Sequence, residues 1–454
     1  MPDDIVGRSI FYFGVIMLKK IEEIFSIPEL RKRILMTLLL LAVFRIGAHV
    51  PTPGVDGAAL SQFFERASGS MLGFFDMFTG GALQKLTVFA LGVMPYISAS
   101  IIMELLAVVV PYIAELKKRG SEGREKITKH TRYLTVVISL IQGLGIAIGI
   151  ENMVAPDGSP VVFIGGWSFR LITALTLTTG TIFLMWLGEK ITSYGVGNGM
   201  SLIIMAGIIS AFPSAVVNTY GLMNSGELQI IPLILACGIM ALSFIAIVFM
   251  ETSQRRLPIQ YVRKGNAGGK VQSTNSYLPL RLNPAGVIPI IFASTLITLP
   301  ATIATFAPND PLLQKLNYIF SPAYPIYYFL EVGLIVFFTY FYTSIIFNPK
   351  DIAENISKSG GVIPGKRPGD ATASYIDYVL TRLTFVGAIY LALVSILPQL
   401  FISGFGLPFY FGGTSLLIVV GVGLDVIQKV EAHLITHNYD GFLKKGRIRG
   451  RNWS

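Results

Sequence analysis

The chain alternates long apolar stretches with shorter polar connections. Ten of these stretches approach or reach the roughly 20 residues that a helix needs to cross the hydrocarbon core of a bilayer. They are residues 34–50, 86–110, 134–150, 171–187, 200–217, 230–250, 285–304, 326–347, 383–402 and 408–427. Glycines interrupt the last stretch, which is the least regular. The pattern predicts an all-α integral membrane protein with ten transmembrane helices.

The composition agrees with a bilayer setting. Of the 454 residues, 52% are hydrophobic and 14% are charged, whereas a soluble domain carries about 25% charged residues. The single cysteine, Cys237, rules out an intrachain disulfide and a cysteine metal site. His433 and His437 have the i, i+4 spacing of a metal-binding pair, but no third ligand or HExxH pattern accompanies them. We therefore expect no metal and no other cofactor.

Lysine and arginine fall almost entirely in alternate connections. All but five of the 36 basic residues lie on the same side of the membrane as the N-terminus. The exceptions are Arg45, Arg66, Lys85, Arg170 and Lys315. Because basic residues concentrate in cytoplasmic loops, both termini and the basic connections are predicted to be cytoplasmic.

Ten helices divide into two halves of five. Because each half has an odd number of helices, the two halves have opposite orientations in the membrane, which permits an inverted repeat. The predicted units are a cytoplasmic amphipathic segment (1–33), an N-terminal half (34–220), a C-terminal half (221–428) and a basic cytoplasmic tail (429–454). Residues 10–18 are apolar but too short and wrongly flanked for a cleavable signal peptide, and Met17 is an alternative start.

One apolar segment is too short to span the membrane. It is residues 71–83 (MLGFFDMFTGGAL), on the outer side and directly before the second predicted helix. Backbone that enters the membrane without spanning it is tolerated only inside protein or beside a water-filled cavity. Gly80 and Gly81 give the segment a flexible joint. We predict a short helix that dips into a cavity; the alternative is a helix lying flat on the outer surface.

Two basic connections, 251–284 and 348–378, are longer than most loops and are candidate docking sites for RNA or an acidic protein surface. Residues 360–366 (GGVIPGK) have the spacing of a phosphate-binding loop. Arg367, however, stands where that loop has a Ser or Thr, and the segment follows a spanning helix rather than a strand. The sequence shows no paired carboxylates and no nucleophile–base pair, so we expect the protein not to be an enzyme.

Several segments together resemble the bacterial SecY family. They include FRIGAHVPTPG (44–54), DMFTGGAL (76–83), FALGVMPYISASII (89–102), LPLRLNPAGVIPIIFAS (278–294) and FNPKDIAENISKSGG (347–361). The matching segments run in family order from residue 34 to the tail. Residues 1–30, 151–170 and 305–325 are poorly covered.

The resemblance implies an hourglass-shaped channel in the bacterial plasma membrane, with ten helices in two inverted halves and a short re-entrant plug helix. Such channels pass unfolded secretory chains outward and release hydrophobic segments sideways into the lipid bilayer. The pore is passive, so an energy source in trans is implied: the SecA ATPase, or a ribosome whose RNA contacts the basic loops. The small membrane subunits SecE and SecG are implied as partners. Signal peptides and translocating chains are implied as the molecules handled.

The resemblance also assigns site residues. An apolar ring at the constriction comprises Val93, Ile97, Met200, Ile204, Ile291 and Ile418. Val93 and Met200 depart from the commoner all-isoleucine ring, which implies slightly looser packing. The plug comprises Met71, Leu72, Phe74, Phe75, Met77, Phe78, Gly80 and Gly81. The lateral gate, between the second and third helices and the seventh and eighth, includes Ser98, Gln142, Asn283 and Leu299. Docking residues are Arg255, Arg256, Arg263, Lys264, Lys366 and Arg367, of which Arg367 matches an arginine implicated in motor and ribosome engagement.

Two other classes of protein compete with a channel. A secondary transporter with inverted repeats would need charges inside the membrane. Most ionisable residues lie near predicted helix ends, and Glu331 is the exception. An insertase or scaffold without a through-pore would not need the short apolar segment. Both alternatives are therefore disfavoured.

Overall fold

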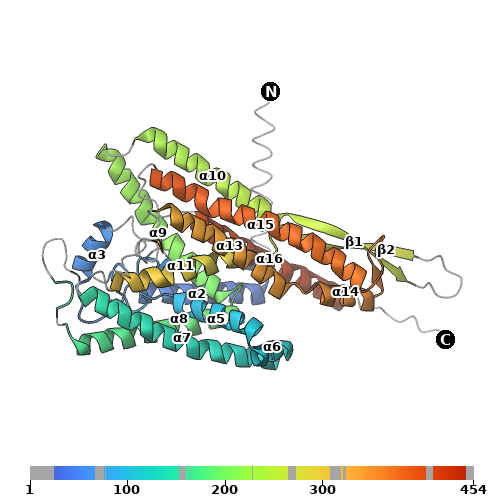
Figure 1. Ribbon diagram of the computed structural model, residues 1–454, viewed down its shortest axis with the longest axis horizontal. Helices are drawn as coiled ribbons and strands as arrows, with labels where there is room; N and C mark the ends of the chain where they lie inside the picture. Colours follow the sequence, from blue (N-terminus) through green and yellow to red (C-terminus); the bar gives the residue numbers. More distant parts are fainter. Residues whose placement is uncertain are drawn as a thin grey trace.

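The computed structural model describes residues 25–66, 76, 78–151, 153, 160–163, 165–226, 229–263, 272–306, 319–320, 324–404 and 413–445. Within these ranges the chain forms a bundle of long helices that run roughly along the longest axis of the molecule (Figure 1). A small sheet projects from one end, and α3 lies toward the other. We call the end that carries the sheet the hairpin end.

Among the described residues, the secondary structure is mostly helical, with three strands. The helices up to the middle of the chain are α2 (Pro28–Gly47), α3 (Gly57–Arg66), α5 (Met94–Val109), α6 (Pro111–Lys118), α7 (Gly120–Glu151), α8 (Trp167–Tyr194), α9 (Gly199–Asn224) and α10 (Ile230–Thr252). After them come β1 (Gln254–Arg263), β2 (Gln272–Arg281), α11 (Ile288–Phe306), α13 (Pro325–Ile346), α14 (Pro349–Lys358), β3 (Gly361–Val362), α15 (Asp370–Gly404) and α16 (Gly413–Lys445).

Each of the ten predicted spans overlaps one helix of the bundle. In the part of the chain that the structure describes, seven helices are long and apolar enough to cross a membrane, or eight if the bent pair α5 and α6 counts as one span. α2 and α11 match the first and seventh predicted spans without meeting that criterion. The multi-pass helical prediction is confirmed, and the count of ten remains a prediction.

The predicted start of the second span is wrong. Residues 86–93 form turns, and α5 begins only at Met94. Leu86 and Gly92 have positive φ angles of 38° and 57°, which are incompatible with a continuous right-handed helix. At the other end, Val110 separates α5 from Pro111, the first residue of α6, and the chain turns by 101° between the two helices. Val110 is extended because a proline disfavours helical conformation in the residue before it.

The two long basic connections are not independent loops. β1 and β2 form an antiparallel hairpin, and β3 adds to β1 through the pair Tyr261 and Gly361. Leu257 and Ile259 of β1 pack with Ile356 of α14 and with residues near the start of α15 in an apolar core of their own. The segment 348–378 therefore contains a helix, a strand and the first turns of α15, and the two connections fold as one unit.

The main apolar core lies in the bundle and draws on both halves of the chain. α7 packs against α5 and α8, and α16 packs against α9, α10 and α15. α11 packs against α13 and also against α5 and α7. It therefore closes the seam where the lateral gate is predicted.

Candidate functional site

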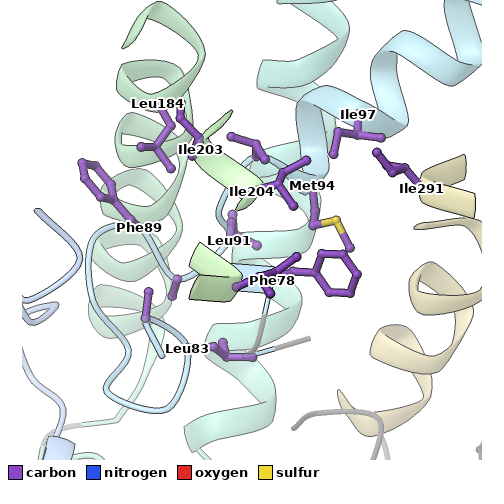
Figure 2. Packing of buried hydrophobic residues seen from close by; sticks show 14 of the residues in the cluster. Phe78, Leu83, Phe89, Leu91, Met94, Ile97, Leu184, Ile203, Ile204 and Ile291 are labelled. Carbon is purple, nitrogen blue, oxygen red and sulfur yellow. The ribbon is translucent and has the colours of Figure 1, made fainter. Parts of the chain in front are cut away.

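The six residues predicted to form the ring are all buried. Their exposed fractions range from 0% for Ile418 to 9% for Met200, and all six belong to the main apolar core. Five of them come from four helices that are far apart in sequence, α5, α9, α11 and α16, and Val93 is the residue just before α5. Figure 2 shows the side chains of Ile97, Ile204 and Ile291 turned toward one region of the interior. The fold thus places all six predicted residues in the main apolar core, and the ring itself remains a prediction.

The start of α9 is positioned by a side-chain cap. Asn198 accepts a hydrogen bond from the backbone nitrogen of Met200 at 3.1 Å, which fixes the first turn. The sulfur of Met200 lies close to Gly188 of α8, where a Cβ atom would come within 2.5 Å of it. Met200 therefore contributes to packing between α8 and α9 as well as to the core.

The described end of the plug segment lies against the same core. Phe78 is buried in it (5% exposed), and Figure 2 shows Phe78 beside Met94 and Leu91. Thr79 is also buried, and its methyl group lies against Gly92, just before α5. The described end of the segment, from Phe78 on, therefore packs inside the bundle rather than lying flat on its surface. Met71, Leu72, Phe74, Phe75 and Met77 lie outside the described residues.

A compact set of hydrogen bonds holds the chain around Asp76. Its carboxylate accepts from the backbone nitrogen of Gln84 at 2.8 Å, and its carbonyl oxygen accepts from Gly81 and Thr79. Burial raises the pKa of the Asp76 carboxyl to about 6, although the hydrogen bonds and the nearby Lys85 lower it. The segment before Gly80 thus contains a carboxyl whose pKa is raised above its ordinary range by burial.

Within the described residues, the polar residues of the predicted lateral gate are not hydrogen-bonded to one another. Ser98 donates to the carbonyl oxygen of Met94 in its own helix at 3.0 Å. Asn283 donates through Nδ2 to Glu251 at 2.7 Å and to the carbonyl oxygen of Gly286 at 3.0 Å. Gln142 Oε1 is buried and has no partner among the described residues. Leu299 lies on α11, but its side chain is outside the described part.

Sequence reasoning missed Glu251, the hydrogen-bond partner of Asn283. Its side chain is buried at the end of α10 (7% exposed) although it stands at the border of a predicted loop. Thr295 was missed as well; it is buried on α11 and contacts the sulfur of Met94 on α5 at 3.9 Å. A buried acid can be suspected from a carboxylate that follows an apolar span directly, but its partner cannot be read from the chain.

Glu331, the acid predicted within a span, joins two helices. It is buried on α13 and accepts a hydrogen bond from Ser395 of α15 at 2.5 Å. This contact gives Glu331 a structural role between α13 and α15.

Four of the predicted docking residues have described side chains, and they lie at the hairpin end. Arg255 and Arg256 of β1 are exposed, as are Lys366 and Arg367 after β3. Arg256 stacks on Tyr277 of β2, with 4.8 Å between the guanidinium carbon and the ring centroid. The side chain of Arg263 and the whole of Lys264 lie outside the described residues. The fold therefore presents cations from both basic connections on one unit.

Buried aliphatic residues drawn from four helices of an apolar bundle, with a short buried segment beside them, are compatible with a channel that has an apolar constriction. The SecY family model matches residues 87–427. A protein translocase subunit SecY from Aquifex aeolicus is 44% identical over 94% of this chain and 100% of its own length. One from Escherichia coli K12 is 43% identical over 94% and 96%.

Solved structures share the fold. A structure described as a protein conducting channel has a TM-score of 0.62 at 16% identity, covering 92% of this chain and 95% of its own. Another, described as showing that the SecY plug domain stabilises the closed state of the translocation channel, has a TM-score of 0.64 at 18% identity over the same shares. The chain belongs to the SecY family, whose members are the pore-forming subunits of protein translocases. It is a multi-pass membrane protein.

Proposed function

We propose that this chain forms the pore by which unfolded secretory proteins cross the plasma membrane and apolar segments enter the bilayer sideways. The observation that carries the proposal is the position of Phe78 in the same buried core as Ile97, Ile204 and Ile291. An aliphatic ring and a plug beside it are two barriers in one path.

The ring supplies the first barrier. Narrow apolar constrictions exclude ions because water leaves them. Aliphatic side chains also fit around a moving polypeptide without offering it hydrogen bonds, so the ring does not retain the passing chain. The plug supplies the second barrier and leaves the path when a chain enters.

The lateral gate is the seam where α11 meets α5 and α7. Separation of these helices would connect the pore to lipid. Of the predicted gate residues, Asn283 lies just before α11, so its hydrogen bonds act on the element that must move.

The hairpin end is proposed to face the cytoplasm, together with both termini. The support is the concentration of basic residues in the connections at this end. The two five-helix halves then have opposite orientations, and no enzymatic step is needed in a passive pore.

Energy and partners come from outside the chain. Structures of the same fold include Sec61 in a canine ribosome–channel complex (TM-score 0.58, 15% identity) and a yeast Ssh1 complex bound to the 80S ribosome (0.60, 15%). We propose that the exposed cations of the hairpin end bind the SecA ATPase or a ribosome, and that SecE and SecG bind the bundle.

Single-channel conductance in planar bilayers tests the pore. Ile204→Ser should remove part of the dewetted barrier and let ions through the resting channel. Ile209→Ser is the matched control, because Ile209 lies on the same helix but is 48% exposed. Deletion of residues 71–78 should give a smaller, fluctuating leak, and the two changes together should leak most. If Ile204→Ser, the deletion of residues 71–78 and their combination all leave the channel impermeable to ions, the proposed pore is excluded.

A further inference from the structure

Arg45 connects three separate parts of the chain. It lies in the last turn of α2, near the outer end by the predicted topology. Its Nη1 atom donates to the carbonyl oxygen of Gly80 at 3.1 Å and to Oγ of Ser210 at 2.8 Å. Ser210 in turn donates to the carbonyl oxygen of Gly207, one turn earlier on α9, at 2.6 Å. One nitrogen of the guanidinium, with two N–H groups, thus joins α2, the plug joint and α9.

At the same joint, the backbone around Gly80 lies so close to the backbone of α9 at Gly207 that no side chain fits between them. A Cβ atom on Gly207 would come within 2.9 Å of the carbonyl oxygen of Phe78. A Cβ on Gly80 would come within 2.9 Å of the Cα of Gly207. Gly80 and Gly81 also have positive φ angles of 70° and 82°, which favour glycine. The backbone of the plug therefore rests directly on the backbone of α9.

We propose that Arg45, Gly80, Gly207 and Ser210 form a latch that fixes the plug in its closed position. The inference rests on the proposed function and adds the residue that positions the plug. Arg45 acts through the backbone of Gly80.

The chemistry of arginine suits this role. A guanidinium inside a membrane span is costly unless its donors are bound or hydrated. In the closed state the carbonyl and the hydroxyl bind it, and these charge-assisted hydrogen bonds are stronger than neutral ones. When a chain displaces the plug, the freed donor faces the water that enters the pore. The latch therefore holds the plug and still releases it reversibly.

Two glycine-to-alanine substitutions on α9 distinguish an effect on the latch from a general effect on the stability of the helix. Gly207→Ala puts a methyl group against Phe78 and should displace the plug. Gly221→Ala makes the same change on the same helix, at a position where a Cβ meets no described atom within 4 Å. Alanine favours the helix at both positions, so a difference between these variants reports on the contact with the plug.

The readout is the reaction of a thiol in the plug with a membrane-impermeant maleimide. Thr79→Cys places the thiol at a site that is 1% exposed, in a background where the exposed Cys237 is replaced by serine. Arg45→Gln and Gly207→Ala should each raise the labelling rate about tenfold or more, which corresponds to about 1.4 kcal/mol in the closing equilibrium. Ser210→Ala should raise it less, because the bond to Gly80 remains, and Arg45→Lys should restore part of the protection.

Controls distinguish the latch from the pore. Arg170→Gln removes another guanidinium of the predicted outer side, one that binds Glu151 rather than the plug, and should leave labelling unchanged. Equal labelling in Arg45→Gln, Gly207→Ala and Gly221→Ala would overturn the latch, even if Ile204→Ser leaks as the pore requires. If Ile204→Ser stays tight while Arg45→Gln and Gly207→Ala expose Thr79→Cys, the latch stands and the pore assignment fails.

Discussion

The Asn283 side chain donates a 2.7 Å hydrogen bond from Nδ2 to Oε1 of Glu251, and this bond joins the connection before α11 to the end of α10. Both side chains are buried, at 1% and 7% exposed. The amide of Asn283 is therefore held by α10 rather than by Ser98 or Gln142 across the predicted seam. Glu251 thus tethers the connection before α11 to the end of α10, and this bond must be lost if α11 is to move away from α10.

Loss of Glu251 should make the lateral gate easier to open. Glu251→Ala releases the Asn283 amide, whereas Glu251→Gln keeps a weaker, neutral acceptor in place. We expect the alanine variant to let less hydrophobic signal segments partition into lipid, with a glutamine variant in between. A double-mutant cycle with Asn283→Ala should give a coupling of about 1–2 kcal/mol. The threshold hydrophobicity of a graded series of signal segments measures each variant.

Glu151→Gln is the control for this change. Glu151 ends α7 and binds Arg170 on α8, so it is an acid at a helix end whose ion pair does not involve the connection before α11. Its threshold should equal that of the parent. Independent, additive effects of Glu251→Ala and Asn283→Ala would mean that the bond does not bias the gate.

The remaining gate residues should differ from one another. Ser98→Ala should have little effect, because the hydroxyl bonds to its own helix at Met94. Gln142→Leu replaces a buried oxygen that lacks a partner among the described residues, and removal of such a group should stabilise the closed seam by about 1 kcal/mol or more. The same series of signal segments should then need a higher hydrophobicity with Gln142→Leu. A lowered threshold would show that Gln142 stabilises the closed gate instead.

The sequence was sufficient for some of these features and not for others. The ring residues followed from the family resemblance, because Ile97, Ile204 and Ile291 lie in segments whose order matches it. The bond between Glu251 and Asn283 could not be predicted, because it depends on how β1 and β2 return the chain to the end of α10. The pairing of Tyr261 with Gly361 was missed for the same reason: it joins residues about a hundred positions apart, and nothing local specifies it.

Arg367→Glu should impair export driven by the SecA motor while leaving the channel folded. Arg367 is exposed, and its backbone position is held independently of its side chain, because Thr372 donates to its carbonyl oxygen at 2.8 Å. Reversing a charge should cost about 2 kcal/mol or more at a desolvated contact with a partner, and little at an exposed rim. Export by inverted membrane vesicles at limiting SecA measures the effect.

Lys350→Glu is the matched control for Arg367→Glu. It makes the same change of net charge at another exposed position of the segment 348–378. Export should fall with Arg367→Glu and remain near the parent level with Lys350→Glu. Equal losses would indicate that the general positive charge of the hairpin end matters rather than this arginine.

Acidification should hold the plug more firmly through Asp76. In the closed state burial raises the pKa of this carboxyl to about 6 from its ordinary 3.8, and a displaced plug in water should restore the ordinary value. Above pH 6 both states carry the charge, and its burial disfavours the closed state. Between about pH 6 and 4 the closed state takes up a proton that the displaced state does not, so the closed state gains stability as the pH falls. Spontaneous opening events in planar bilayers should therefore be rarer at pH 5 than at pH 7.5.

Asp76→Asn tests whether this carboxyl is the titrating group. Its amide oxygen can still accept the hydrogen bond from Gln84, and the uncharged side chain imitates the protonated acid. The variant should open rarely at both pH values, like the parent at pH 5. A second test uses Lys85, the charged neighbour that lowers the pKa of Asp76. With Lys85→Gln the pKa of Asp76 should rise further, and the pH at which the opening frequency changes should therefore be higher. If Asp76→Asn keeps the full pH dependence of the parent, the proton is taken up elsewhere in the channel.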